Sequence, residues 1–159
     1  MITTGLGYDI HRFSEGRPLV LGGIVIPHHR GLQGHSDADV LTHAIADALL
    51  GAIGERDIGH HFPDTDESLR GICSLEILSH ARELVTARRA TINNIDATLV
   101  AEEPKIGPHF DSIRQSLALT LGLPVERIGL KATTNEGLGS IGRGEGIAAM
   151  AIATVERPA

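Results

Sequence analysis

The 159-residue chain contains few residues of several types, and each shortage excludes a kind of structure or partner. Cys73 is the only cysteine, so an internal disulfide is excluded and a reducing, cytoplasmic location is expected. Aromatic residues make up 3% of the chain, Lys105 and Lys131 are its only lysines, and the net charge is −6. An acidic, aromatic-poor chain without a basic stripe is not expected to bind nucleic acid.

Long apolar runs are also missing. No stretch approaches the length of a membrane span, and the first residues carry no basic and apolar segment of the kind that begins a secretory signal. We therefore expect no membrane partner. The length suits one domain, residues 1–159, that can bury a core of its own.

The spacing of apolar residues predicts strands that alternate with helices. Strands are expected over residues 6–13, 91–100, 128–134 and 147–155, with a β-hairpin over 19–26 that turns at Gly22 and Gly23. Helices are expected over about 36–53, 74–88 and 109–121, the first one capped by Ser36 and Asp39. This order predicts an α/β or α+β fold in which helices pack on a mixed β-sheet.

Asp9-Ile10-His11 and His43 predict a metal site. Alternate residues of a strand share a face, so Asp9 and His11 can point at one spot, and His43 can approach from a helix. Two imidazoles and one carboxylate suit Zn²⁺ and leave a fourth position open. Asp39 or Asp47, four residues before and after His43, could accept its second N–H. In a chain with nine histidines the pair could also be fortuitous, and these acids could form a solvated helix face.

Three other stretches allow more than one interpretation. Residues 137–142 match G-x-G-x-x-G, but too little chain follows for a dinucleotide-binding unit, so these glycines are assigned to sharp turns or close contacts. Residues 131–136 could hold phosphates and a hard cation, or simply end a strand. In the acidic loop 57–66, Asp57 and Gly59 could bind sugar hydroxyls, although such residues are also typical of turns.

Taken together, stretches along nearly the whole chain resemble the 2-C-methyl-D-erythritol 2,4-cyclodiphosphate synthases. They include Gly7-Tyr8-Asp9-Ile10-His11, His35-Ser36-Asp37, Asp57-Ile58-Gly59, Phe62-Pro63-Asp64-Thr65-Asp66, Pro104-Lys105, Lys131-Ala132-Thr133-Thr134 and Gly142-Arg143-Gly144-Glu145-Gly146. No one stretch is decisive, but their combination and order are highly specific.

The resemblance implies an α+β homotrimer whose sheets surround the three-fold axis, with helices outside and active sites between neighbouring subunits. It implies ring closure of 4-diphosphocytidyl-2-C-methyl-D-erythritol 2-phosphate with release of CMP, aided by Zn²⁺ and by Mg²⁺ or Mn²⁺. Two alternatives are a zinc-dependent nucleotide-diphosphate phosphohydrolase and a non-catalytic, metal-stabilised binding protein.

The resemblance also implies roles for individual residues. Asp9, His11 and His43 would hold zinc, and Glu136 would hold the second divalent ion. His35 and Thr134 would stabilise charge on the transferring group. The implied substrate contacts are His35 and Ser36 at the erythritol phosphate, Asp64 at the erythritol, Asp57 and Gly59 at the ribose, Thr133 and Thr134 at phosphate, and the segment 101–107, with Ala101, Lys105 and Gly107, at the cytosine. Phe62, Asp66, Ala132 and Arg143 complete the set.

Two positions depart from the family's pattern. Asn135 replaces a frequent Thr, and Ser140 stands where a Phe is usual, in a region that lines a cavity on the three-fold axis. Some members bind isoprenoid diphosphates in that cavity, near the position of Arg143, and a serine there removes apolar lining.

Overall fold

The computed structural model describes residues 1–158. Its strands are β1 (Ile2–Ser14), β2 (Leu19–Leu21), β3 (Ile24–Ile26), β4 (Gly31–Leu32), β5 (Thr91–Val100), β6 (Ile128–Thr133) and β7 (Gly146–Glu156). Its α-helices are α1 (Val40–Ala52), α2 (Ile58–His61), α3 (Ser74–Ala87), α4 (Phe110–Leu121) and α5 (Gly139–Gly142). Short 3₁₀ turns cover Glu67–Leu69, Gly107–His109 and Val125–Arg127.

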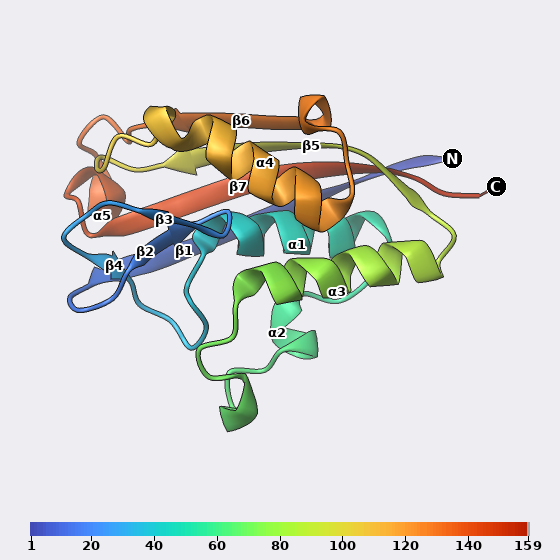
Figure 1. The fold of residues 1–159 in the computed structure, drawn as a ribbon, viewed down its shortest axis with the longest axis horizontal. Helices are drawn as coiled ribbons and strands as arrows, with labels where there is room; N and C mark the ends of the chain where they lie inside the picture. The colour runs from blue at the N-terminus through green and yellow to red at the C-terminus, as the bar shows by residue number, and fades with distance from the viewer. Residues whose placement is uncertain (159) are drawn as a thin grey trace.

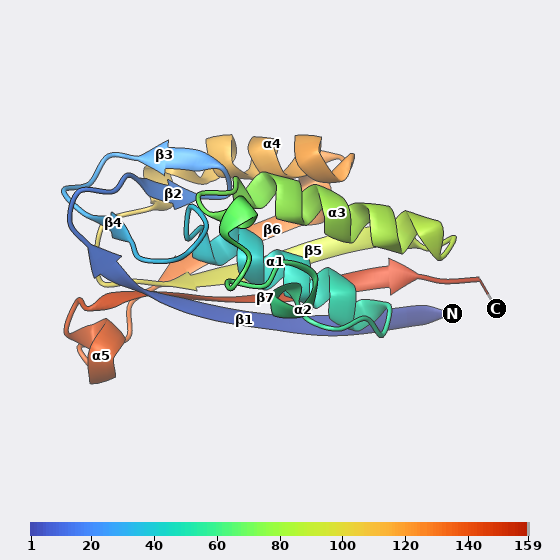
Figure 2. The ribbon, with the colours of Figure 1, turned by 90° about the horizontal axis from the view of Figure 1, so that it is seen from below.

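A five-stranded mixed sheet, ordered β4-β1-β7-β5-β6, forms the base of the molecule. β1 and β5 both run antiparallel to β7, and β6 runs parallel to β5. Helices α1, α3 and α4 lie on one side of this sheet, and the two chain ends meet at one end of it (Figures 1 and 2). The predicted mixed sheet with helices packed on it is therefore confirmed.

Most predicted elements are present, with shifted ends. β5 has the predicted bounds, and the hairpin turns at Gly22 and Gly23, whose φ angles are 59° and 77°. β1 starts four residues earlier than expected, at Ile2. The loop 55–66 contains the unpredicted helix α2, and the glycine-rich stretch 137–142, where no helix was expected, contains the four-residue helix α5.

The predicted cap of the first helix is wrong. α1 begins at Val40, and its N-cap is Asp39, whose carboxylate accepts hydrogen bonds from Thr42 N at 3.0 Å and Thr42 Oγ1 at 2.7 Å. The same carboxylate accepts from Gly22 N at 2.9 Å and Gly23 N at 2.8 Å. Asp39 is fully buried, so these four donors replace the water that the carboxylate loses on folding. The side chain thus joins the start of α1 to the β2–β3 turn.

Two glycines let α1 pack directly on β1. Gly5 and Gly7 lie on the face of β1 that is turned toward α1, and a Cβ atom there would overlap the backbone of Ala48 and Ala44, respectively. Any side chain at either position would push the helix away from the strand. Asp9 and His11 follow on the same face, because residues two apart along a strand point the same way.

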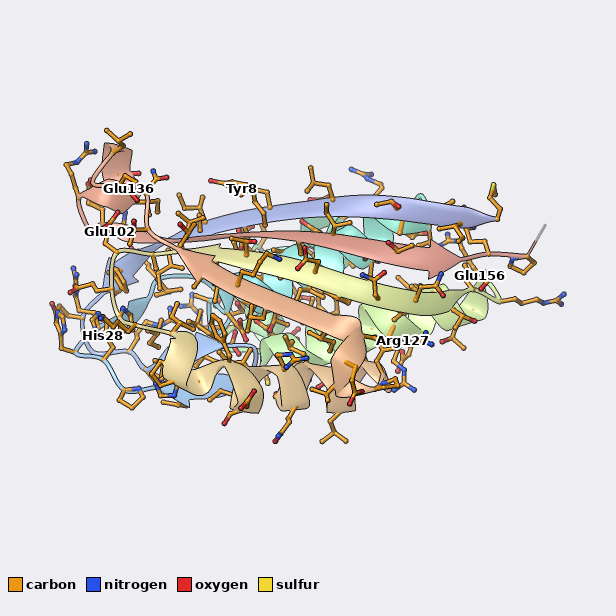
Figure 3. All side chains as sticks on the ribbon, turned by 90° about the horizontal axis from the view of Figure 1, so that it is seen from above. Tyr8, His28, Glu102, Arg127, Glu136 and Glu156 are labelled. Atoms are coloured by element: carbon orange, nitrogen blue, oxygen red, sulfur yellow. The ribbon has the colours of Figure 1, made fainter. Side chains whose placement is uncertain are left out.

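The opposite face of the sheet carries exposed apolar side chains. Leu6, Tyr8 and Ile10 on β1 are 70%, 55% and 44% exposed, and Met150 and Ile152 on β7 are 44% and 46% exposed. Tyr8 pairs with Met150 and Leu6 with Ile152, so these residues form one continuous patch, and Figure 3 shows Tyr8 standing away from the sheet. A patch of this kind commonly marks a protein–protein interface.

Within residues 1–158, none of the helices combines the length and the apolar character needed to cross a lipid bilayer.

We expect Gly7→Ala to lower the free energy of unfolding by about 2–3 kcal/mol or more, because the new methyl group overlaps the α1 backbone. Gly51→Ala on α1 is the matched control. A Cβ there meets Gly5 Cα at 3.6 Å, which is an ordinary contact, and alanine favours a helix by roughly 0.5–1 kcal/mol. Chemical denaturation of the two metal-free variants measures the difference. Equal stability of both would contradict the proposed backbone contact.

Candidate active site

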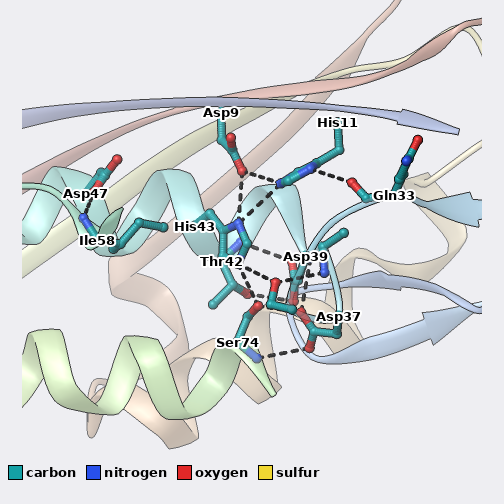
Figure 4. Close-up of polar contacts among 12 residues, drawn as sticks. Asp9, His11, Gln33, Asp37, Asp39, Thr42, His43, Asp47, Ile58 and Ser74 are labelled. Atoms are coloured by element: carbon teal, nitrogen blue, oxygen red, sulfur yellow. Dashed lines mark hydrogen bonds and ion pairs between the residues drawn. The ribbon is translucent and has the colours of Figure 1, made fainter. Parts of the chain in front are cut away.

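Asp9, His11 and His43 meet where β1 faces α1 (Figure 4). Asp9 Oδ2 lies 2.9 Å from His11 Nε2 and 3.0 Å from His43 Nδ1, and the two imidazole nitrogens are 3.4 Å apart. All three side chains are largely shielded from solvent, at 25%, 19% and 8% exposure. Residues 34 positions apart in the chain are thereby brought to one point.

The spacing of these three atoms suits a divalent metal ion. Ligand bonds of about 2.0–2.1 Å in a tetrahedral site place neighbouring ligand atoms ~3.3 Å apart. The observed separations of 2.9, 3.0 and 3.4 Å lie close to this value, so small movements would complete the coordination. The donor set, two nitrogens and one carboxylate oxygen, is one that zinc and similar ions accept.

A second possible metal group, His28, His29 and Glu103, is less suitable. Glu103 Oε1 already pairs with Arg30 Nη2 at 3.3 Å. The fixed positive charge of Arg30 would repel a metal cation held by that carboxylate. Asp9, His11 and His43 are therefore the better candidate for a metal site.

Hydrogen bonds behind the two histidines differ from those expected. His11 Nδ1 donates to the Gln33 carbonyl at 2.8 Å, which leaves Nε2 free to act as a ligand. His43 Nε2 lies 2.7 Å from Ser74 Oγ and 3.2 Å from Ser36 Oγ, so the predicted partners of His43 are wrong. Asp39 is occupied by the cap of α1, and Asp47 accepts from Ile58 N at 2.8 Å.

Charge in the metal group is set by the short contacts of Asp9. Burial alone would raise the pKa of Asp9, but its close contacts with the His11 and His43 imidazoles outweigh burial and lower the pKa to about 2. Burial would lower the pKa of His11, yet the Asp9 carboxylate raises it above 6.5. Asp47, beside the group, has a pKa raised by burial. Asp9 is therefore a carboxylate across the physiological range and available as a ligand.

A cavity of about 660 Å³ opens over the metal group. It gathers six of the other predicted site residues, which come from the loop after β4, from α2 and from the loop after α2. They are His35, Ser36, Asp57, Gly59, Phe62 and Asp64. The carboxylate of Asp57, at the N-cap of α2, makes no capping hydrogen bond there, so it can accept from a ligand.

Three predicted residues in this region already have intramolecular partners. His35 Nε2 donates to the Asp66 carbonyl at 3.0 Å, while the Asp66 carboxylate accepts from Ser68 N at 3.0 Å and caps the turn that follows. Ser36 is buried, and its hydroxyl accepts from Ala38 N and faces His43. His35 Nδ1 and the backbone of Ser36 are thus better placed to contact a ligand than His35 Nε2 and the Ser36 hydroxyl.

Six further predicted residues line a different cavity of about 500 Å³. Its lining contains Ala101, Lys105 and Gly107 from the loop after β5, and Ala132, Thr133 and Thr134 from the end of β6. It shares no lining residue with the cavity over the metal group. One chain therefore presents the predicted site as two separate halves.

Glu102 connects the loop after β5 to the loop that follows β6. Its carboxylate accepts from Asn135 N at 2.9 Å and Gly137 N at 3.3 Å. The predicted metal ligand Glu136 lies between these two residues, with a φ angle of 52°, and Figure 3 shows Glu102 and Glu136 near each other at the end of the molecule that carries α5. The sequence alone did not indicate these hydrogen bonds of Glu102.

Arg143 lies beside a third, smaller cavity. It follows α5 and pairs with Glu145 at 2.7 Å. Glu145 and Ser140 are among the residues that line this cavity, of about 230 Å³. Arg143 is thus placed apart from both larger cavities, next to the departure noted at Ser140.

Sequence reasoning missed three residues that hold the site in place. Gln33 and Ser74 orient the histidines, and Arg17 donates to the Gly34 and Ser36 carbonyls at 2.7 and 2.6 Å. Each acts across a turn or between distant elements, so no local pattern indicates it. The Ser74 contact, for instance, spans 31 residues.

Comparisons with known proteins place the chain in one family. The model of the YgbB family matches residues 2–156. The chain is 55% identical over 151 residues to the 2-C-methyl-D-erythritol 2,4-cyclodiphosphate synthase of Alkaliphilus metalliredigens, with 95% of each chain covered. It is 56% identical over 153 residues to the protein of that name from Synechococcus elongatus, with 96% of each covered.

Solved structures show the same fold. A 2C-methyl-D-erythritol-2,4-cyclodiphosphate synthase in a CDP-bound form superimposes with a TM-score of 0.88 at 42% identity, over 96% of this chain and 99% of that one. The bifunctional IspDF protein of Campylobacter jejuni superimposes with a TM-score of 0.93 at 42% identity, over 99% of this chain and 43% of that longer one.

In the metal-free protein, Asp9→Asn should lower the pKa of His11, since burial then acts without an adjacent negative charge. NMR titration of the His11 ring should show a midpoint above 6.5 in the wild type and below it in the variant. The raised pKa stabilises the fold fully below pH 6.5, and this contribution disappears as the pH rises through the His11 pKa.

Asp64→Asn is the control for this titration, because Asp64 lines the same cavity without contacting His11. An unchanged His11 midpoint in Asp9→Asn would show that Asp9 does not govern this imidazole.

Proposed function

The chain belongs to the YgbB family of 2-C-methyl-D-erythritol 2,4-cyclodiphosphate synthases, and we propose that it carries out their reaction in a site shared between neighbouring subunits. In this reaction the 2-phosphate of 4-diphosphocytidyl-2-C-methyl-D-erythritol 2-phosphate attacks the β-phosphorus, CMP leaves, and a cyclic diphosphate forms. The protein is thus a phosphorus–oxygen lyase of the non-mevalonate isoprenoid pathway. We place it in the cytoplasm, which its single cysteine supports.

The division of the site into two halves supports this proposal most strongly. The cavity over Asp9, His11 and His43 carries the residues proposed for the erythritol and the ribose, while the second cavity carries those proposed for the cytosine and the phosphates. A substrate with a sugar phosphate at one end and a base at the other needs both halves. Two neighbouring copies of one domain can supply them.

The apolar patch on the open face of the sheet supports a homotrimer. Leu6, Tyr8 and Met150 are exposed on a single subunit, and their burial between copies would remove this apolar surface from water. We propose that three sheets meet around a common axis with the helices outside. The end of β6, with Thr133 and Thr134 exposed, would then complete the cavity of a neighbouring subunit.

Cations are needed because both reacting phosphates are anionic. Zn²⁺ at Asp9, His11 and His43, and Mg²⁺ or Mn²⁺ at Glu136, would supply charge neutralisation and Lewis acidity when bound. The donor geometry of the first group suits zinc. The exposed carboxylate of Glu136 is of the kind that a hard cation prefers.

The chain's own residues would bind and orient the substrate. Thr133 and Thr134 can donate hydroxyl hydrogen bonds to phosphate oxygens, and His35 can donate from Nδ1 in its protonated form while Nε2 stays on the Asp66 carbonyl. Asp57 can accept from ribose hydroxyls. No side-chain nucleophile is required, because the attacking phosphate is already ionised, so holding both arms of the substrate accounts for much of the catalysis.

Mixed trimers test the shared site. His43→Ala and Glu136→Ala subunits should each be inactive alone, because each lacks a different half of the proposed site. After subunit exchange, some interfaces combine the intact half of one variant with the intact half of the other, and part of the activity should return. An Asp9→Ala and His43→Ala mixture is the control, since both lesions lie in one half and no interface escapes them. Demonstrated mixed trimers without recovered activity would contradict a shared site.

Reaction in ¹⁸O-water separates the synthase from the alternative hydrolase, which the comparisons do not support. In a synthase the substrate's own 2-phosphate attacks, so neither product gains solvent oxygen. Tethering favours this route, because the internal phosphate has an effective concentration on the order of 10⁵ M or more in well-oriented cases. We expect an unshifted product mass and a ³¹P spectrum of two coupled phosphorus atoms in one ring.

A linear product carrying one heavy oxygen would make this protein a hydrolase. Pre-formed cyclic product incubated in ¹⁸O-water without the protein is the control for spontaneous ring opening. Binding of CDP without any release of CMP from the substrate would instead indicate a binding protein.

A further inference from the structure

We propose that Asp37 and Ser74 form a positioning relay that fixes which nitrogen of His43 carries a proton, and so keeps Nδ1 available to the metal. The proposal rests on the metal role of His43 argued above. It adds two residues that do not bind the metal themselves but control one of its ligands through hydrogen bonds. Both residues and their contacts are drawn in Figure 4.

Ser74 is placed between the other two members. It is the first residue of α3 and is fully buried. Its hydroxyl oxygen lies 2.7 Å from His43 Nε2 and also contacts Asp37 Oδ1 at hydrogen-bond distance. The three side chains therefore form a continuous hydrogen-bonded row that ends at the imidazole.

The carboxylate of Asp37 determines which group donates and which accepts in each of these hydrogen bonds. Besides the Ser74 hydroxyl it accepts from Ser74 N at 3.0 Å and Asp39 N at 3.1 Å, so each of its contacts is a donor. Its negative charge also lies at the N-terminus of α3, where the helix dipole favours an anion. A carboxylate can only accept, so the single hydroxyl proton of Ser74 points to Asp37. The Ser74 oxygen must then accept from His43.

The direction of these hydrogen bonds determines which nitrogen of His43 is available to a metal ion. With its Nε2 proton donated to Ser74, neutral His43 carries its lone pair on Nδ1, which is the nitrogen 3.0 Å from Asp9 and 3.4 Å from His11 Nε2. If Asp37 did not hold the serine proton, the hydroxyl could turn and donate to Nε2. The imidazole proton would then sit on Nδ1, where the metal must bind. Ser36 cannot prevent this, because its hydroxyl can donate or accept at Nε2.

Zinc affinity tests the relay without reference to catalysis. Competition with a chromophoric chelator at pH 8 gives the zinc Kd of the purified full-length protein. Ser74→Ala and Asp37→Asn should each raise this Kd about 10- to 100-fold, the usual effect of losing a partner behind a metal ligand. Ser79→Ala removes a hydroxyl from the same helix at a half-exposed position and should leave the Kd unchanged.

The two substitutions should not act independently. Once the Ser74 hydroxyl is absent, the Asp37 carboxylate has no path to His43, so Asp37→Asn should weaken zinc binding by a smaller factor in the Ser74→Ala background than in the wild type. A purely structural effect of each residue would give the same factor in both backgrounds. Asp37→Asn keeps the shape of the side chain, and it decides the question if Ser74→Ala does not fold.

NMR of the His43 imidazole provides a second test of the relay, independent of zinc affinity. In the zinc-loaded wild type, with ¹⁵N-labelled histidine, the Nε2 proton of His43 should appear as a slowly exchanging, downfield imidazole signal that is lost or shifted in both relay variants and retained in Ser79→Ala. Unchanged zinc Kd values in both relay variants, equal factors in the two backgrounds, or an unaltered Nε2 signal would overturn the relay. Failure of the wild type itself to bind zinc would instead overturn the proposed metal site.

Discussion

The close approach of α1 to β1 is the constraint on which the rest of the structure depends. Gly5 and Gly7 place no side chain against the helix backbone at Ala48 and Ala44, so the helix lies directly on the strand there. Because Asp9 and His11 continue the same face of β1, and His43 projects from α1, this contact sets the distance between the strand and helix residues of the candidate metal site. The chemistry of the site is thus determined partly by two residues that have no functional group.

A second constraint is the fully buried carboxylate of Asp39. Its four donors come from the first turn of α1 and from the tight turn between β2 and β3, and burial raises its pKa. Removing the side chain would leave several buried N–H groups without partners, at about 1–3 kcal/mol each. Asp39 thus fixes where α1 begins, and this in turn fixes the position of His43, four residues after Asp39.

The sequence predicts those parts of the fold and site that follow from local periodicity. β5, the glycine turn of the hairpin and the shared face of Asp9 and His11 all reflect short-range spacing, and the structure has each of them. The wrong predictions concern positions where several side chains could have made the same hydrogen bond. The sequence predicts that Ser36 and Asp39 cap the first helix together, and that Asp39 or Asp47 accepts from His43. In the structure, burial and the β2–β3 turn make Asp39 the cap, and the packing of α3 brings Ser74 to His43. These deciding residues lie 16 and 17 positions from Asp39 and 31 positions from His43.

Glu102 has a consequence for how ligands would bind. Its carboxylate holds the backbone on both sides of Glu136, while its own loop lines the cavity next to Ala101 and Lys105. Because these hydrogen bonds join the two loops, a ligand that restricted one of them would also restrict the other, and the entropy loss would be shared between two binding events. If this cavity takes a base and Glu136 a cation, as proposed above, linkage requires the effect to be reciprocal: the base would strengthen cation binding by the same factor by which the cation would strengthen binding of the base. The order in which nucleotide and cation arrive would leave that factor unchanged.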